Sequence, residues 1–217
     1  ISTKCFWPMS EDVNDTGLSR KHIMESVHKS LKRIGTDYID IYFCHRPDPN
    51  TPAEETVGAM TDLVRQGKIL YWGTSEHSAD QLNAAHAAAR DTIACAPRVE
   101  QPQLNLVARD RYHSDIQPTA YDLGMGLVTW SPLASGILSG KHTLDGHKSS
   151  RLRMAGLDWL RERELTTERL KKVEKLKAIA AKLDMPMPVL ALAWCLKNPH
   201  VSTVILGASK VEQLKEN

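Results

Sequence analysis

The stretch YIDIYFCH, residues 38–45, indicates the fold because it is a short run of β-branched and aromatic residues that ends in a polar side chain. Four similar runs follow it, and the first four of the five begin about thirty residues apart, which is a repeat signal. The later runs are KILYWGTS (68–75), RVEQPQLN (98–105), GLVTWS (126–131) and STVILGAS (202–209). The opening ISTK, residues 1–4, resembles the end of one more strand.

Longer amphipathic segments separate these runs, and the alternation predicts βαβ units with parallel strands. One helix is expected over residues 19–34. The next is expected to begin with Thr51 as N-cap, Pro52 at the first helical position and Glu54 completing a capping box, and to stop at Gly67. Further helices are expected from residue 78, over 109–123 with an interruption at Pro118, over 167–183 and over 188–197.

Six strands in βα succession favour an α/β fold of the (β/α)8 TIM barrel type, in which eight strands close the sheet. We expect a single barrel domain over residues 1–217 that apparently lacks its first two βα units, and we expect those units to precede residue 1 in the natural protein. Residues 142–166 interrupt the alternation of strand and helix patterns because they form a long, polar, basic connection. This segment is either a disordered insertion or a functional lid.

Composition narrows the class of protein. The 217 residues include 28 basic and 26 acidic side chains spread along the chain, which argues against a nucleic-acid or anionic membrane partner. The four cysteines lie far apart without a CxxC pair, so we expect no metal site, no disulfide framework and a cytoplasmic location. The apolar run VLALAWCL, residues 189–196, is far shorter than the roughly 20 residues of a membrane helix, so no membrane insertion is expected.

Polar groups stand at the carboxyl ends of the predicted strands, where a TIM barrel places its active site. His45 follows a nearly apolar strand, and there an imidazole can be tuned for hydrogen-bond donation or proton transfer. The alternative is a structural histidine bonded to loop carbonyls. The strand-end groups are Lys4, His45, Ser75, Gln101 with Asn105, Trp130 with Ser131, and Gly207 with Ser209.

Two other segments suit an anion. SPLASG, residues 131–136, is a loop of small residues whose backbone could approach a phosphate, with Lys141 adding charge. GASK, residues 207–210, places a turn and Ser209 before a terminal helix, and an ordinary helix cap is the alternative. Neither segment matches a P-loop or a GxGxxG motif, so no Rossmann-type dinucleotide site is inferred.

With these positions assembled, the chain resembles the aldo-keto reductase family, and in particular the branch that includes the β-subunits of voltage-gated potassium channels. The stretches that carry the resemblance are GLSRKHI (17–23), RPDPNTPAEETV (46–57), YWGTS (71–75), TWSPLASGILSGK (129–141), LAWCLKN (192–198) and LGASKVEQLKEN (206–217). The resemblance implies a (β/α)8 barrel that binds NADP(H) across the strand ends without a metal. Hydride then passes from the nicotinamide to an aldehyde or ketone.

The resemblance also implies roles for individual residues. Lys4 and His45 match the family's catalytic lysine and histidine, which assist a tyrosine proton donor; that tyrosine and its aspartate partner are expected upstream of residue 1. Trp7 is a candidate wall of the substrate pocket, and so is Trp72, for which core packing is the alternative. The residues matched to the cofactor are Ser75, Gln101, Trp130, Ser131, Pro132, Leu133, Gly136, Lys141, Arg151, Gly207, Ser209, Gln213, Glu216 and Asn217.

In this assignment Ser75 and Gln101 hold the nicotinamide carboxamide, Trp130 stacks on the ring, and residues 131–141 serve the pyrophosphate. Arg151 matches a lid residue, so residues 142–166 are expected to cover the cofactor. Ser209 and Gln213 lie nearest the 2′-phosphate. Two departures from the family pattern leave the local charge and the NADPH preference open: Glu76 stands where relatives carry Asn or Arg, and Gln213 where many reductases carry Arg.

Two functions follow. The first is a reductase of small carbonyl compounds that can form homo-oligomers, and His45 favours it because the channel subunits resemble this chain in RPDPNTP but carry asparagine before it. The second is a regulatory subunit that binds NADP(H) with little or no turnover. The two differ in one measurable quantity, the rate of NADPH oxidation.

Overall fold

The computed structural model describes residues 1–142, 152 and 154–217. Their packing divides the chain into two compact units. Unit 1 comprises Ile1–Pro102 and His113–Leu127, and unit 2 comprises Gln103–Tyr112 and Val128–Asn217. Each unit is described separately below.

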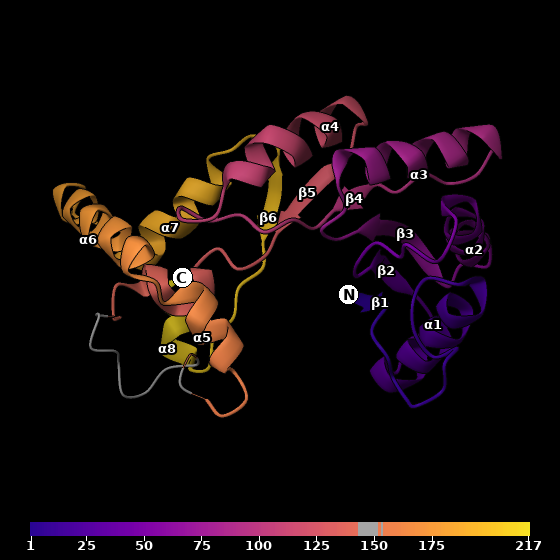
Figure 1. The fold of residues 1–217 in the computed structure, drawn as a ribbon, viewed down its shortest axis with the longest axis horizontal. Coiled ribbons are helices and arrows are strands. Elements are labelled where there is room, and N and C mark those ends of the chain that lie inside the picture. The colour runs from indigo at the N-terminus through magenta and orange to yellow at the C-terminus, as the bar shows by residue number, and fades with distance from the viewer. Residues whose placement is uncertain (143–151, 153) are drawn as a thin grey trace. The chain divides into compact units, whose positions relative to one another are not determined.

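The strands form a sheet of six whose hydrogen-bonding order is the order along the chain (Figure 1). Neighbouring strands from β1 to β5 are parallel, as βαβ units require. This arrangement confirms the α/β prediction. The strands are β1 (Ser2–Cys5), β2 (Ile39–Cys44), β3 (Ile69–Thr74), β4 (Val99–Glu100), β5 (Gly126–Thr129) and β6 (Val201–Val204).

Three helices of unit 1 lie along one side of its strands (Figure 1). They are α1 (Arg20–Ile34), α2 (Ala53–Arg65) and α3 (Ala79–Asp91). In α1, Ile23, Val27 and Leu31 recur at helical spacing and are buried in one cluster with Trp72 of β3. Burial of each such side chain contributes about 1.5–3 kcal/mol. Trp72 is therefore a core residue, with its Nε1 donating to the Cys95 carbonyl oxygen at 2.8 Å.

The ends of α1 and α3 carry the expected capping chemistry. The Ser19 hydroxyl accepts from the backbone N–H of His22, and Gly35 ends α1 in the left-handed conformation with φ 75°. A reciprocal capping box between Ser78 and Gln81 opens α3. The predicted start of α2 was wrong, because Thr51 donates its hydroxyl to Asp48 Oδ2 at 2.9 Å and makes no cap.

Pro118 lies where its helix changes type. A π-helical turn, Tyr112–Ile116, runs directly into α4 (Gln117–Asp122), and Pro118 lies in the first turn of α4. The chain stays helical through this segment, and the irregularity predicted at Pro118 takes the form of a change from π-helical to α-helical hydrogen bonding.

Two strands are shorter than predicted. The strand pattern of residues 98–105 yields only the two residues of β4, because Pro102 has no N–H to continue the ladder. The pattern of residues 202–209 ends at Val204, after which the Ile205 N–H still donates to the Thr129 carbonyl oxygen at 2.8 Å. Residues 205–209 are exposed, and apolar content alone overstated the length of this strand.

Helices of unit 2 form a second core. They are the 3₁₀ segment η2 (Ala134–Ser139), α5 (Asp158–Glu164), α6 (Thr167–Lys182) and α7 (Met187–Leu196). The short helix α8 (Val211–Glu216) also belongs to unit 2 and has no buried residue. Ile137, Leu160, Val173 and Ala191 are buried together in this core. The predicted lid segment, residues 142–166, thus includes a regular helix, α5, whereas residues 143–151 and 153 lie outside the described residues. Its role as a cofactor cover stays a prediction.

No single helix in the described ranges is long and apolar enough to cross a membrane. Only α6 and α7 taken together meet the length and composition criteria, and they are bent by 91° at the break between them.

Candidate active site

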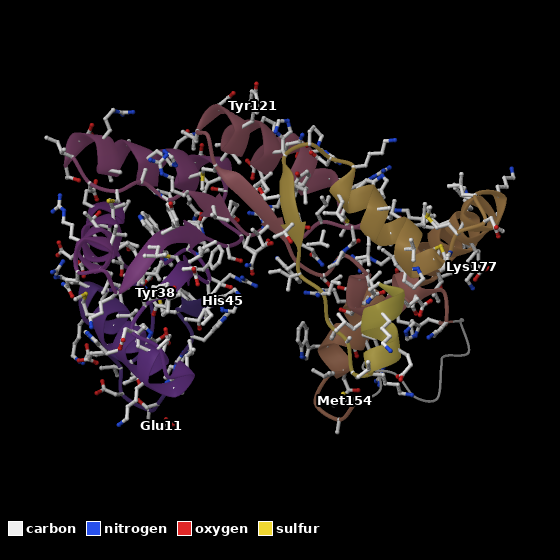
Figure 2. All side chains as sticks on the ribbon, turned by 180° about the vertical axis from the view of Figure 1, so that it is seen from behind. Glu11, Tyr38, His45, Tyr121, Met154 and Lys177 are labelled. Carbon is white, nitrogen blue, oxygen red and sulfur yellow. The ribbon has the colours of Figure 1, made fainter. Side chains whose placement is uncertain are left out.

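Lys4 and His45 come from neighbouring strands and lie at the same edge of the sheet in unit 1. Lys4 is opposite Phe43 in the β1–β2 register, and its Nζ lies 5.6 Å from the centre of the Phe43 ring. His45 follows β2 directly, and its backbone N–H donates to the Cys5 carbonyl oxygen at 2.9 Å. Figure 2 labels His45 among the side chains of this unit. The parallel register therefore brings these two candidate residues together.

Both residues line one cavity of about 170 Å³. Trp7 lies in the same wall, with its ring 6.0 Å from the His45 ring at an angle of 79°. Arg46 places its guanidinium carbon 6.0 Å from the Trp7 ring. Polar side chains of α1, among them Lys29, complete the lining, and none of the lining residues carries a carboxylate. This cavity joins an aromatic wall to a cationic one, in which Asp15 pairs with the Lys29 ammonium at 3.0 Å.

The surroundings depress the pKa of both bases. Burial lowers the pKa of His45 to about 4, and the positive charges of Arg46 and Lys4 add to this effect. Burial also lowers the pKa of Lys4, again with a contribution from Arg46. The imidazole of His45 is therefore neutral at pH 7 and can donate one hydrogen bond.

We expect NMR titration of the His45 imidazole to give a pKa near 4. Because this value lies below the roughly 6.5 of an unfolded histidine, the folded state binds fewer protons between the two values. His45 should therefore destabilise the fold as pH falls from about 6.5 towards 4. A measured pKa at or above 6.5 would contradict the described burial and cationic surroundings.

Ser75 and Gln101 form a second buried pair in unit 1. The Ser75 hydroxyl donates to the Gln101 carbonyl oxygen at 2.9 Å, and the Gln101 N–H donates to the Thr74 carbonyl oxygen at 2.8 Å. Their exposed fractions are 1% and 3%. Gln101 Nε2 is buried, and within the described ranges it makes no hydrogen bond. A buried amide donor of this kind suits a ligand carbonyl such as that of a carboxamide.

The residues matched to the pyrophosphate lie in one loop of unit 2. Trp130 pairs with Gln103 in an isolated β-bridge, and Asn105 Nδ2 donates to the Ser131 carbonyl oxygen at 3.0 Å. After this bridge the chain turns through Pro132 and Leu133 into η2. Four residues in this loop have left-handed φ angles: Ser131 at 56°, Ala134 at 48°, Ser135 at 56° and Gly136 at 101°. The N–H groups of Ala134, Ser135 and Gly136 donate hydrogen bonds within this turn, and the exposed Lys141 follows it. The assignment of this loop to the pyrophosphate stays a prediction.

The residues matched to the adenosine end lie around the start of α8 in unit 2. Gln213 Oε1 accepts from the Ser209 N–H at 2.9 Å, the Ser209 hydroxyl at 3.2 Å and the Lys210 N–H at 3.2 Å. These bonds cap a short helix, so the capping alternative describes this segment. Gly207 precedes this cap, and Glu216 and Asn217 lie at the end of α8. The 2′-phosphate assignment stays a prediction.

Sequence reasoning missed three features of unit 1. Arg46 follows His45 directly and sets its charge environment. Glu100 is fully buried beside Gln101, and Glu76 has a left-handed backbone with φ 61°. Residues 98–105 are mostly polar, so no sequence signal marked Glu100 as buried, and none marks the backbone of Glu76. Arg151, by contrast, was predicted and lies outside the described residues.

Comparison with known proteins agrees with this arrangement. Residues 1–217 match the model of the Aldo/keto reductase family. The chain is 46% identical over 218 residues to a protein of Oryza sativa subsp. japonica and 47% identical over 218 residues to one of Arabidopsis thaliana, each named "Probable voltage-gated potassium channel subunit beta". These alignments cover 100% of this chain and 66% of each relative. The strand-end groups, the sheet order and the match over every residue lead to one conclusion: the chain belongs to the aldo/keto reductase family.

Proposed function

We propose that this chain is part of an NADPH-dependent reductase that converts aldehydes or ketones to alcohols. The observation that carries the proposal is the shared cavity of Lys4 and His45, in which Trp7 provides an aromatic wall. Reduction of a carbonyl needs a donor for the developing alkoxide and an apolar surface for the substrate. This cavity supplies both from neighbouring strands.

His45 acts in this proposal as a neutral hydrogen-bond donor to the carbonyl oxygen. Its depressed pKa keeps the ring uncharged, so the ring orients and polarises the carbonyl without giving up a proton. A preorganised donor of this kind in a partly dry site is worth about 3 kcal/mol of transition-state stabilisation.

Lys4 supports the residue that gives the proton. A cation in this cavity lowers the pKa of a neighbouring phenol. None of the five tyrosines of this sequence lines the cavity, and Tyr42 lies in the apolar core. We therefore assign the proton donor to a tyrosine outside these 217 residues, with its hydroxyl facing the Lys4 ammonium group.

The described residues fit a nicotinamide cofactor. In this proposal the Gln101 Nε2, which has no hydrogen-bond partner in the described ranges, donates to the carboxamide oxygen, and the Ser75 hydroxyl turns to the same group. The exposed Lys141 ammonium, which follows the turn from Ser131 to Gly136, can offset the charge of the pyrophosphate. NADPH, when bound, supplies the hydride that reduces the carbonyl carbon.

A second candidate function is regulatory, because the plant relatives carry the name of a channel subunit beta. In this alternative the chain binds NADP(H) and reports its redox state with little or no turnover. Both functions need the same cofactor residues, so cofactor binding alone does not separate them.

The separating experiment uses the natural full-length protein. Its intact mass is measured first, and NADPH absorbance is then followed with methylglyoxal and with a nitrobenzaldehyde. Substrate-dependent oxidation of NADPH is the expected result. Tight NADPH binding without oxidation of either substrate would favour the regulatory function, and absence of NADPH binding would overturn both.

We expect Gln101→Leu to weaken NADPH binding about tenfold, because it removes the amide donor while keeping a similar volume. The affinity is measured by calorimetric titration of the full-length protein. Gln117→Leu, at the start of α4, is a matched control outside the candidate site and should leave the affinity unchanged. Equal affinity in Gln101→Leu and the wild type would rule out the carboxamide assignment.

A further inference from the structure

Glu100 is a buried carboxyl that the proposed chemistry does not use. It is 0% exposed and lies opposite Thr74 in the β3–β4 register. The Thr74 hydroxyl donates to Glu100 Oε2 at 2.5 Å, and the backbone amides of Glu76 and His77 also face this carboxyl. Oε1 has no hydrogen-bond partner within the described ranges. Removing a carboxyl group from water costs free energy, and favourable contacts inside the protein must offset that cost.

The contacts of Glu100 lie on the opposite face of the sheet from Ser75 and Gln101, the candidate carboxamide site. Successive side chains of a strand point to opposite faces of the sheet. Thr74 and Glu100 therefore share one face, while Ser75 and Gln101 continue the strands on the other. The Thr74–Glu100 hydrogen bond thus joins the two strand ends from behind, at the point where Ser75 donates to the Gln101 carbonyl oxygen.

The loop that Glu100 contacts has an unfavourable backbone conformation. Glu76 follows Ser75 and has φ 61°, in the left-handed region that residues with a Cβ rarely adopt. Such a conformation persists only where its surroundings hold it, and such sites gather near functional groups. The Glu100 carboxyl is the buried polar group that faces the amides on both sides of this strained position.

We propose that Glu100 is a positioning residue for the cofactor site, and that its carboxyl holds residues 75–77 so that Ser75 and Gln101 present their polar groups to the carboxamide. This role rests on the proposed function, because its effect is measured as NADPH affinity. Glu100 itself points away from the cofactor face and touches no reacting atom.

Because Glu100 is titratable, the proposed positioning role predicts that NADPH affinity depends on pH. Burial raises its pKa to about 8, the negative charge of Glu76 adds to this, and the Thr74 hydroxyl opposes it. The Cys44 thiol of β2 also faces it, and its own pKa is raised. His77 faces Glu100 with its backbone amide, whereas its ring Nδ1 lies 3.2 Å from the Ser75 carbonyl oxygen. The carboxyl is thus protonated at pH 7 and ionises as pH rises through about 8. Glutamine mimics the protonated form.

The test compares Glu100→Ala and Glu100→Gln with the wild type by calorimetric NADPH titration from neutral to alkaline pH, alongside urea unfolding. We expect the alanine variant to bind NADPH about tenfold more weakly, because a displaced donor loses most of its alignment. Glutamine should restore most of that affinity. The affinity of the wild type should fall as pH rises through about 8, and that fall should be absent in Glu100→Gln.

Thr74→Val tests the same hydrogen bond from its other end and replaces Glu100→Ala should that variant fail to fold. Thr61→Val is the matched control, since the Thr61 hydroxyl is buried and bonded to the Val57 carbonyl oxygen in α2. It should cost stability without changing NADPH affinity. Wild-type affinity in folded Glu100→Ala and Thr74→Val would overturn the positioning role alone. Failure of the wild type to bind NADPH would overturn the proposed function and this role with it.

Discussion

Substitution of His45 by alanine is expected to lower kcat about 100- to 1,000-fold while NADPH affinity stays within about twofold of wild type. The variant loses the donor that faces the developing alkoxide. Its neighbours in the cavity, Lys4 and Trp7, remain in place because His45 is attached to the sheet through its backbone N–H. The measurements are steady-state NADPH oxidation and a separate NADPH titration of the full-length protein.

Two further variants make this expectation specific. His28→Ala removes an exposed histidine of α1 whose Nδ1 is hydrogen-bonded to the Met24 carbonyl oxygen, and it should leave kcat unchanged. His45→Asn keeps a neutral donor on a shorter side chain, so its kcat should lie between those of wild type and alanine. Unchanged turnover in His45→Ala would show that His45 has a structural role and does not take part in catalysis.

The fold could be predicted where local rules and burial agree. Ser19 and Gly35 bound α1, and Ile23, Val27 and Leu31 bury one of its faces, so pattern and packing point the same way. The predicted start of α2 was wrong because Asp48 accepts the hydrogen bond of the Thr51 hydroxyl, a contact that no capping rule anticipates. The same carboxylate also accepts from the Leu18 N–H at 2.7 Å, so its position is fixed by a distant segment.

The candidate site was predictable to the extent that it consists of strand ends. Lys4, His45, Ser75 and Gln101 follow from a parallel sheet whose carboxyl edge gathers such groups. Their support was not predictable, since burial of Glu100 and the left-handed backbone of Glu76 depend on the packing of neighbouring strands. Physical reasoning from sequence thus found the groups that face a ligand more readily than the groups behind them.

The second large effect is expected from Gly73→Ala, which should lower the free energy of unfolding by at least about 3 kcal/mol. A Cβ at Gly73 would lie 2.4 Å from the Val99 carbonyl oxygen and 2.9 Å from Phe43 Cε1. The first contact is with backbone, so β3 and β4 must separate to relieve it. The second contact would also push on the Phe43 ring of β2, whose centre lies 5.6 Å from Lys4 Nζ.

Gly58→Ala is the control that gives this result its meaning. Gly58 lies inside α2, and a Cβ there meets no atom within 4 Å, so alanine should raise the stability by about 0.5–1 kcal/mol through its better helix propensity. Urea unfolding of both variants should give shifts of opposite sign for the same chemical change. A Gly73→Ala variant as stable as wild type would mean that β3 and β4 can move apart freely, and the close strand packing that supports Ser75 and Gln101 could then not hold them in place.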